Sequence, residues 1–265
     1  LSMAYTPGVA RVSNAIAADR SKVYTLTIKS NSVAVITDGS AILGLGNLGP
    51  EAALPVMEGK AMIFKEFAGI DAWPICLATQ DTEEIIKTIV NIAPVFGGIN
   101  LEDISSPRCF EIESRLRERL DIPVMHDDQH GTAVVVLAAL QNALKLVGKN
   151  IGNIKVVVSG LGAAGVACCK ILLNAGVRNL LGSNRKGIVV KCDGENLQAA
   201  KDNIFTCIHR DEPIMTLREA LVGADVFIGV SKAGLLNGEM IATMAPRPII
   251  FAMANPVPEI MPDEA

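Results

Sequence analysis

Two pairs of adjacent carboxylates carry the clearest chemical signal in the chain. Glu102-Asp103 follows the apolar segment 98–101, and Asp127-Asp128 follows a second such segment, 122–125. In parallel α/β folds, the carboxyl ends of the strands present the functional side chains. Carboxylates without neighbouring cysteine or regularly spaced histidine suit a hard divalent ion such as Mg²⁺ or Mn²⁺ better than zinc. The sequence therefore predicts a divalent-metal site at the ends of two strands.

A glycine loop farther along the chain predicts a dinucleotide site. A strand-like segment, 154–159, precedes the loop and a helical segment, 166–173, follows it. The first glycine permits a tight turn, the second lets backbone approach the phosphates, and the third allows close packing of helix on strand. The helix N-terminus adds N–H groups and a favourable dipole. The loop consists of Gly160, Leu161, Gly162, Ala163, Ala164 and Gly165.

The same G-x-G-x-x-G pattern also occurs earlier, over residues 44–49. Pro50 and Pro55 follow it at once, so we expect no uninterrupted helix N-terminus there to hold a pyrophosphate. A tight turn near an active site is the interpretation we favour for this first loop.

The residue that ends the strand after the second loop bears on the choice between NAD and NADP. An acidic residue is expected there for NAD, because it binds the ribose hydroxyls. This chain has Asn184, followed by Arg185 and Lys186. The missing carboxylate and the two cations favour NADP slightly over NAD, although Arg185 and Lys186 also fit a solvated turn.

Composition narrows the class of protein. Of the 265 residues, 50% are hydrophobic, and the formal net charge of −4 with no basic cluster argues against nucleic acid and anionic membranes as partners. The six cysteines lack disulfide-framework or zinc spacing. The longest apolar run, 133–140, is far shorter than the roughly 20 residues of a membrane span. We expect a cytoplasmic protein that does not enter the membrane.

Strand-like and helical segments alternate through the chain, which predicts an α/β fold with two domains. A substrate- and metal-binding domain over 1–129 precedes a Rossmann-type domain over 130–265, with the active site in the cleft between them. We expect the first domain to be truncated at its N-terminus and the second at its C-terminus. The predicted strands are 33–37, 74–78, 98–101, 122–125, 155–159, 179–182, 225–230 and 248–253. The predicted helices are 82–92, 107–120, 131–147, 163–175, 216–222 and 237–244.

Taken together, the motifs of this chain resemble those of the malic enzyme family, particularly its shorter bacterial members. The resemblance covers nearly the whole length, and the motifs occur in the family's order. The matching segments are 4–8, 37–49, 57–60, 97–103, 126–133, 160–165 and 254–256. The resemblance implies oxidative decarboxylation of malate to pyruvate and CO₂, with NAD or NADP as the nucleotide and Mg²⁺ or Mn²⁺ as the metal. It also implies a homodimer or higher homo-oligomer.

The resemblance also implies roles for individual residues. Glu102, Asp103 and Asp128 resemble the metal ligands. Lys60 is similar to the general base or a member of its proton relay, a role that requires a depressed pKa. Two more residues match at the ends of the chain: Tyr5 resembles the acid that protonates the enolate, and Asn255 resembles the amide that contacts substrate or nicotinamide.

Several residues near these motifs also have structural interpretations. Asp127 fits a helix N-terminal acid stabilised by the dipole, in preference to a ligand. His126 and His130 fit flanking or core roles better than metal ligation. Asp38 fits either a hydrogen-bonded support of the site or simple turn chemistry.

Three alternative functions use the same residues differently. A malolactic enzyme would keep the nucleotide bound and release lactate, and sequence alone does not separate it from the oxidative enzyme. An amino-acid dehydrogenase would share the nucleotide domain but has no need of the carboxylate clusters. A non-catalytic NAD(P)-binding regulatory protein would not need Tyr5, Lys60 and the metal ligands together.

Overall fold

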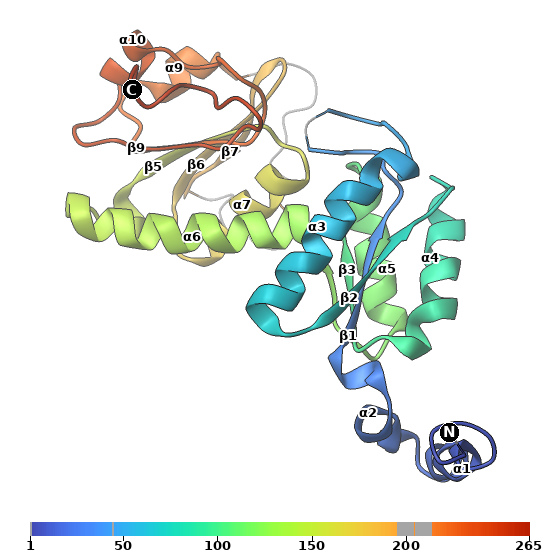
Figure 1. Ribbon diagram of the computed structural model, residues 1–265. Coiled ribbons are helices and arrows are strands. Elements are labelled where there is room, and N and C mark those ends of the chain that lie inside the picture. The colour runs from blue at the N-terminus through green and yellow to red at the C-terminus, as the bar shows by residue number, and fades with distance from the viewer. Residues whose placement is uncertain (1, 44, 195–203, 205–213) are drawn as a thin grey trace. The chain divides into compact units, whose positions relative to one another are not determined.

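The computed structural model describes every residue except 1, 44, 195–203 and 205–213. Two residues considered in the sequence analysis therefore lie outside the described residues: Cys207 and Gly44, the first glycine of the early loop. The chain divides into two compact units, one formed by residues 1–42 and 46–126 and the other by residues 43–45 and 127–265 (Figure 1). The expected cleft between the domains and the expected domain limits stay predictions.

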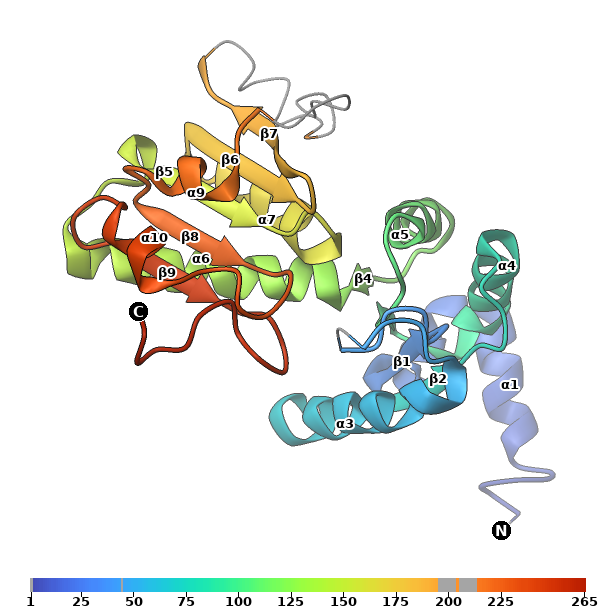
Figure 2. The ribbon, with the colours of Figure 1, turned by 90° about the horizontal axis from the view of Figure 1, so that it is seen from above.

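The first unit is built on a four-stranded parallel sheet with the order β2-β1-β3-β4. Strand β1 is almost fully buried, as expected for a central strand of a parallel sheet. Helix α3 lies on one side of the sheet, and α4 and α5 lie on the other (Figure 2). The strands are β1 (Ser32–Thr37), β2 (Asp71–Cys76), β3 (Gly98–Leu101) and β4 (Val124–His126), and the helices are α3 (Pro50–Ala68), α4 (Thr82–Ile92) and α5 (Arg108–Arg119), with the 3-10 turn η3 (Ala93–Val95).

An N-terminal helical arm precedes β1 and has little core of its own. It consists of α1 (Val9–Ala18), η1 (Arg20–Lys22), α2 (Val23–Leu26) and η2 (Ile28–Asn31), and no residue of α1 or α2 is buried. The arm joins the sheet at the amino end of β1, which Figure 1 shows in dark blue. Lys29 anchors the junction, since its ammonium donates hydrogen bonds to the carbonyl oxygens of Ala93, Pro94 and Phe96. Burial lowers the pKa of Lys29.

The second unit contains a five-stranded sheet with the order β7-β6-β5-β8-β9. Four strands are parallel, and β7 pairs antiparallel with β6 at the edge. Helices α6 and α7 cover one face, and α9 and α10 cover the other (Figure 1). The strands are β5 (Lys155–Ser159), β6 (Asn179–Asn184), β7 (Gly187–Cys192), β8 (Val226–Gly229) and β9 (Ile249–Ala252); the helices are α6 (Asp127–Val147), η4 (Ile151–Asn153), α7 (Ala163–Asn174), α9 (Leu217–Leu221) and α10 (Gly238–Ala242).

The strand order of the second sheet creates the place where this fold binds ligands. The chain leaves β5 toward β6 on one side and later returns to β8 on the other. Such a reversal opens a crevice at the carboxyl ends of the strands, and α/β proteins bind nucleotides there. The predicted α/β fold with a Rossmann-type second half is confirmed.

The predicted elements differ from the structure at several places. No helix was predicted before residue 82, yet α1, α2 and α3 form there, and β2 begins three residues before the predicted start at 74. Helix α3 starts at Pro50 and runs without a break through Pro55. A proline at the first helical position costs no hydrogen bond, and packing on β1 and β2 holds the rest. Helix α6 begins at Asp127, four residues before the expected start, so the acidic pair forms its first turn. Strand β7 was not anticipated, since no element was predicted between residues 183 and 215.

Helix α6 also changes the membrane argument. Its 21 residues are long and apolar enough to cross a membrane by length and composition, whereas the run 133–140 alone is too short. Mostly buried core helices of soluble proteins pass the same test, whereas 22% of the apolar window of α6 is buried. A single such helix is weak evidence for a membrane span. This helix packs against α7 and starts with two aspartates.

Candidate active site

Three carboxylates come together at the carboxyl edge of the first sheet. Glu102 and Asp103 follow β3, and Asp128 stands in the first turn of α6, two residues after β4 ends. One ligand oxygen from each residue lies within 4.8 Å of the other two. Glu102 is 5% exposed and Asp103 is 3% exposed. The structure therefore brings together the three residues that the sequence singled out as metal ligands.

The chemistry of this cluster fits a hard divalent cation. Carboxylates this close in a buried setting repel one another, and a bound cation would offset that repulsion. Oxygen donors of this kind suit Mg²⁺ or Mn²⁺. Close by on β3, the Asn100 side-chain oxygen is buried and has no hydrogen-bond partner among the described residues. A further oxygen acceptor at this edge adds to the polar set that a hydrated cation can use.

Lys60 and Asn100 both contact Glu102. The Lys60 ammonium lies 3.3 Å from Glu102 Oε2, and Asn100 Nδ2 donates a hydrogen bond of 2.8 Å to the same oxygen. Lys60 is on α3, and its side chain is 22% exposed. Read alone, this lysine would be assigned to the surface, but the fold places it beside the carboxylate cluster.

A buried network fixes the turn that carries Asp103. Asp38 is fully buried after β1, and its carboxylate accepts hydrogen bonds from Arg108 Nη2 at 2.9 Å and from Ser40. Ser40 Oγ in turn accepts from the Ser105 backbone N–H at 2.9 Å. The Ala41 N–H donates to the Asp103 carbonyl oxygen at 3.0 Å. The turns after β1 and β3 are thus tied together, which holds Asp103 in a left-handed conformation with φ of 53°.

Sequence reasoning left Asp38 undecided between support and turn chemistry, and it does both. It missed Arg108 and Ser105 altogether. The available signal was the proximity of Ser105 and Arg108 to Glu102-Asp103 in the chain. Their partners are distant in sequence, however: Ser105 bonds to Ser40, and Arg108 bonds to Asp38, 70 positions away.

The remaining polar residues of this edge have structural contacts. His126 is fully buried at the end of β4, and its backbone N–H donates to Glu113 Oε1 at 3.2 Å. Asp127 folds against its own helix: a Cβ built on Gly131 would lie 2.3 Å from Asp127 Oδ1. Glycine at 131 is therefore what gives the Asp127 carboxylate its room in the first turn of α6.

Tyr5 stands apart from the cluster. It is 73% exposed in the arm that joins the amino end of β1. Glu102 and Asp103 lie at the opposite, carboxyl edge of the same sheet. The structure therefore does not bring Tyr5 to the carboxylates of its own chain.

The second glycine loop shows why each glycine is needed. Gly160 has φ of 103°, and a Cβ there would lie 2.7 Å from the Val230 carbonyl oxygen. A Cβ on Gly165 would lie 1.8 Å from the Gly160 carbonyl oxygen. At Gly162 a Cβ would meet nothing within 4 Å. Packing thus explains the first and third glycines, whereas open space in front of Gly162 is what a ligand's phosphates would use.

The early glycine loop is a turn packed on the end of β1. Gly46 and Gly49 have φ of 91° and 89°. The backbone N–H groups of Leu48 and Gly49 donate to the Gly39 carbonyl oxygen. Helix α3 follows this loop, but the N–H groups of Leu48 and Gly49 bond within the turn, which agrees with the interpretation of the loop as a turn.

A cavity of about 700 Å³ opens in front of the second glycine loop. Arg185, Lys186 and Lys232 line it, and none of its described lining residues is acidic. Asn184 ends β6, and its side-chain oxygen accepts a 2.8 Å hydrogen bond from the Lys186 N–H. The other lining residues are Ser159, Gly160, Leu161, Gly162, Ser183, Gly187, Thr216, Leu217, Val230, Ser231 and Leu235. Asn255, in the turn after β9, does not line this cavity.

The thiols near the nucleotide loop are unsuited to nucleophilic chemistry. Burial in α7 raises the pKa of Cys168 to about 12 and that of Cys169 well above its ordinary value. Burial also raises the pKa of Cys76 in the first unit. Since the thiolate is the reactive form, these cysteines act as apolar packing groups at neutral pH.

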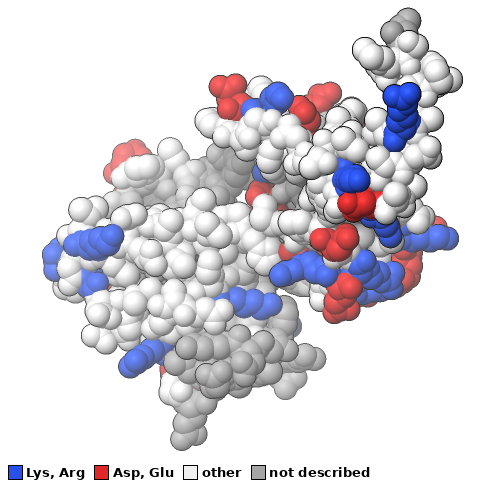
Figure 3. Space-filling model, turned by 90° about the horizontal axis from the view of Figure 1, so that it is seen from below, with Lys and Arg blue, Asp and Glu red and all other residues white. Residues whose placement is uncertain are grey.

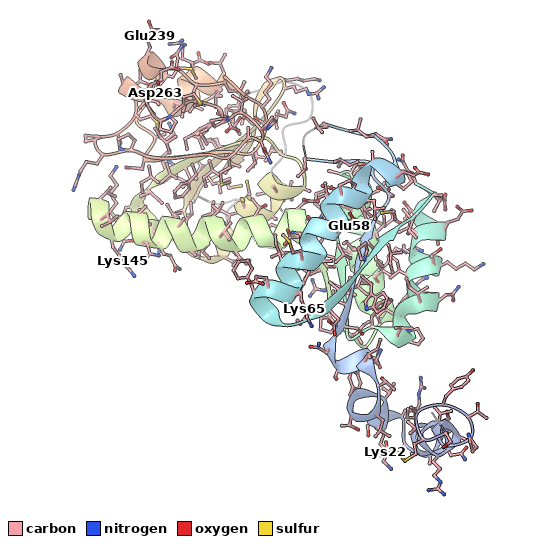
Figure 4. The ribbon with its side chains drawn as sticks, viewed as in Figure 1. Lys22, Glu58, Lys65, Lys145, Glu239 and Asp263 are labelled. Carbon is pink, nitrogen blue, oxygen red and sulfur yellow. The ribbon has the colours of Figure 1, made fainter. Side chains whose placement is uncertain are left out.

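Charges elsewhere on the surface are interspersed. On the face drawn in Figure 3, Lys and Arg lie beside Asp and Glu over the first unit. The side chains of Lys65 and Asp71 form one such pair at 2.7 Å, at the end of α3 where Figure 4 labels Lys65. This face offers no large field of one sign.

Two family profiles match the chain. The malic enzyme N-terminal domain matches residues 1–86 and 78–117, and the malic enzyme NAD binding domain matches residues 129–264. The chain belongs to the malic enzyme family. The resemblance found in the motifs is confirmed, and a malic enzyme assignment decides against the amino-acid dehydrogenase alternative.

Individual malic enzymes resemble this chain over its whole length. An NAD-dependent malic enzyme of Geobacillus stearothermophilus is 61% identical over 100% of this chain and 55% of its own length. A bifunctional malic/malolactic enzyme of Bacillus subtilis is 54% identical over 100% of the chain and 65% of its own. The crystal structure of an NAD-dependent malic enzyme from Thermotoga maritima matches with a TM-score of 0.91 at 52% identity, covering 100% of this chain and 71% of that one.

This malic enzyme chain thus spans 55% and 65% of the two curated relatives. NADP-dependent malic enzymes also occur among its relatives, so the family alone does not choose between the two dinucleotides.

Proposed function

We propose that the protein containing this chain oxidises and decarboxylates malate to pyruvate and CO₂, with reduction of NAD or NADP. The observation that carries the proposal is the Lys60–Glu102 contact at 3.3 Å within the carboxylate cluster. This contact places a candidate base beside a candidate metal site at the carboxyl edge of the first sheet. The glycine loop and cavity of the second unit support the dinucleotide part of the reaction.

The proposed metal ligands are Glu102, Asp103 and Asp128. Mg²⁺ or Mn²⁺ held there would chelate the hydroxyl and carboxylate of malate, lower the hydroxyl pKa, and polarise the ketone for decarboxylation. The proposal is supported by the contacts that orient these residues: Asn100 donates a hydrogen bond to Glu102, and the Asp38 network fixes the turn that carries Asp103.

Lys60 is the proposed general base. A neutral Lys60 would take the proton of the C2 hydroxyl, and a bound dinucleotide would accept the hydride from C2. A divalent cation on Glu102 would offset the carboxylate charge that otherwise favours the protonated lysine. The C3–C4 bond then breaks, CO₂ leaves, and C3 takes a proton. Tyr5 is the proposed donor of that proton, and Asn255 is proposed to contact substrate or nicotinamide.

We further propose that the protein is a homodimer or higher homo-oligomer in which Tyr5 acts on a neighbouring copy. The support is topological: Tyr5 and the carboxylates belong to opposite edges of one sheet. Mixing a Lys60→Ala variant with a Tyr5→Phe variant tests this. If Tyr5 acts across copies, the mixture regains activity that neither variant has alone. No recovery after subunit exchange would contradict it.

NADP is the slightly favoured dinucleotide. Three cationic side chains and no described carboxylate line the cavity. The cations would attract the 2′-phosphate of NADP, and no carboxylate among them would repel it. We also propose a cytoplasmic location, supported by five described cysteines that form no disulfide.

The test of the proposed function is malate-dependent nucleotide reduction with Mn²⁺ on the full-length protein. NAD and NADP are assayed in parallel, pyruvate and lactate are quantified, and Lys60→Ala is the control. Equal amounts of reduced nucleotide and pyruvate, lost in Lys60→Ala, are the expected result. Lactate without net reduction would favour the malolactic alternative, which the relative from Bacillus subtilis keeps in view. Binding of metal and nucleotide without either product would favour the regulatory alternative.

A further inference from the structure

Glu259 is a fully buried carboxylate that the proposed reaction does not use. It lies in the segment after β9. Its two oxygens accept separate backbone hydrogen bonds: Oε1 from the Ser231 N–H and Oε2 from the Ala254 N–H, each at 3.0 Å. One donor belongs to the turn after β8 and the other to the turn after β9. A single side chain thus joins two turns at the carboxyl edge of the second sheet.

Both turns lead to residues of the proposed nucleotide site. Ser231 lines the cavity, together with Val230 and Lys232 on either side of it. The Ser231 hydroxyl lies 3.4 Å from that of Ser159, the last residue before the glycine loop. Ala254 directly precedes Asn255, the residue proposed to contact substrate or nicotinamide.

The turn after β8 also packs directly against the glycine loop. A Cβ on Gly160 would lie 2.7 Å from both the Val230 carbonyl oxygen and Ser231 Cβ. A Cβ on Gly165 would lie 3.4 Å from Val230 Cγ2. The position of Val230-Ser231 therefore sets the space in which the glycine loop lies.

The sheet leaves room for the Glu259 carboxylate at one glycine. A Cβ on Gly229, the last residue of β8, would lie 2.3 Å from Glu259 Cδ and 2.5 Å from Oε1. A buried carboxylate is costly unless hydrogen bonds satisfy it. A hydrophobic residue could fill this space without that cost. We therefore infer that the carboxylate serves to order the two turns whose N–H groups donate to it.

We propose that Glu259 is a positioning residue that aligns the turns after β8 and β9, and so sets the affinity of the second unit for NAD(P). The inference rests on nucleotide binding by this unit as proposed above. Backbone contacts hold the Glu259 segment independently of its side chain: the Leu236 N–H donates to the Glu259 carbonyl oxygen at 3.0 Å, and the Gly234 N–H donates to that of Pro258 at 3.2 Å.

The test compares wild type with Glu259→Gln and Glu239→Gln. A glutamine has one acceptor oxygen and an NH₂ group, so one of the two backbone N–H groups then faces a donor. Glu239 is 83% exposed on α10 and points outward in Figure 4, which makes it the matched control. Dissociation constants for NAD and NADP are measured by calorimetry well below the melting temperature of each variant, and hydrogen exchange is followed at the Ser231 and Ala254 amides.

The expected result for Glu259→Gln is a dissociation constant for the preferred dinucleotide about tenfold higher, with faster exchange at the Ser231 or Ala254 amide. The Leu236 amide, the Mn²⁺ affinity and the Glu239→Gln variant should match wild type. In steady-state assays the nucleotide KM rises more than kcat falls. A lower melting temperature with unchanged dissociation constants would assign Glu259 a purely structural role and overturn the inference.

Two further measurements remain informative even if Glu259→Gln fails to fold. Gly229→Ala, which pushes against the carboxylate while keeping it, should weaken nucleotide binding in the same way. In the wild type, saturation with NAD or NADP should slow exchange at the Ser231 and Ala254 amides, and no change there would overturn the inference. Failure of the wild type to bind either dinucleotide would instead overturn the proposed function.

Discussion

The two sheets use different chemistry at the same structural position. At the carboxyl edge of the first sheet, the proposed functional groups are side chains: a cluster of carboxylates, with Lys60 and Asn100 beside it. At the carboxyl edge of the second sheet, the proposed nucleotide site is formed by the backbone of the glycine loop, where the missing side chains leave room for a ligand. If both proposals hold, the first site depends mainly on charge and the glycine loop of the second depends mainly on space. Substitutions that leave shape unchanged should therefore harm the first site, and substitutions that leave charge unchanged should harm the second.

The largest expected effect is that of Asp103→Asn. Asparagine keeps the size of the side chain and tolerates the left-handed backbone at this position, but it removes a ligand charge. We expect Mn²⁺-dependent malate oxidation to fall by at least about 100-fold. The melting temperature of the metal-free protein should not fall, since the substitution relieves repulsion within the cluster. The malate assay and Mn²⁺ titration calorimetry measure the loss of activity and of metal binding, and thermal unfolding of the metal-free protein measures its melting temperature.

The control for Asp103→Asn is Asp263→Asn, a substitution of an exposed aspartate near the C-terminus (Figure 4). It should leave Mn²⁺ binding and activity at the wild-type level. Retention of full Mn²⁺ affinity by Asp103→Asn would remove this residue from the proposed ligand set.

Two glycine substitutions in the second unit distinguish a glycine needed for packing, Gly165, from one proposed to leave room for the ligand, Gly162. Gly165→Ala places a Cβ 1.8 Å from the Gly160 carbonyl oxygen and should destabilise the fold by about 1–3 kcal/mol. Gly162→Ala meets nothing within 4 Å, so the melting temperature should stay unchanged while nucleotide affinity falls about tenfold. Thermal unfolding and nucleotide calorimetry on both variants check this. Equal nucleotide affinity in Gly162→Ala and wild type would place the phosphates elsewhere.

Among the side chains that line the cavity, charge should affect mainly the choice of dinucleotide. Arg185→Ala removes one of the cations that line the cavity, so NADP should bind roughly fivefold more weakly while NAD affinity stays constant. Lys145→Ala, on the exposed side of α6, is the matched loss of a cation away from the cavity (Figure 4). An equal loss for NAD and NADP would show that Arg185 does not read the 2′ position.

The smallest expected effect concerns an exposed carboxylate, in contrast with the buried ones of the first site. Glu219 accepts hydrogen bonds from the Thr216 backbone N–H and hydroxyl in a capping box, and these contacts lower its pKa. A lowered pKa in the folded state contributes stability above the ordinary glutamate value of 4.5, and that contribution is lost as pH falls through the folded pKa.

Glu219→Gln should therefore lower stability slightly at neutral pH and differ less from wild type as the pH falls below 4.5. Urea unfolding across this range measures the difference. A constant difference at all pH values would mean that the Glu219 charge makes no contribution.

Local sequence patterns determined the elements that depend on local chemistry. The strand limits of β3 and β5 and the limits of α4 match the predicted ranges. The Thr216–Glu219 capping box forms as its spacing indicates, because its hydrogen bonds lie within one helical turn. The second glycine loop sits between strand and helix as predicted. The two carboxylate pairs at 102–103 and 127–128 could be predicted to lie at one edge because both follow parallel strands, and the family resemblance selected Asp128 from the second pair.

Long-range contacts decided the rest. Lys60 resembles a surface lysine until α3 packs on β1 and β2 and brings it to Glu102. Tyr5 matches a catalytic motif, yet the arm that carries it joins the opposite edge of the sheet. Asp38 with Arg108 and Glu259 with Ser231 are pairs separated by long stretches of chain, and local pattern does not reveal such partners. The sequence by itself determined which chemical groups are present and which strands end beside them. Only the tertiary structure decided which of these groups meet, because burial and hydrogen bonding between distant segments depend on the packing of whole elements.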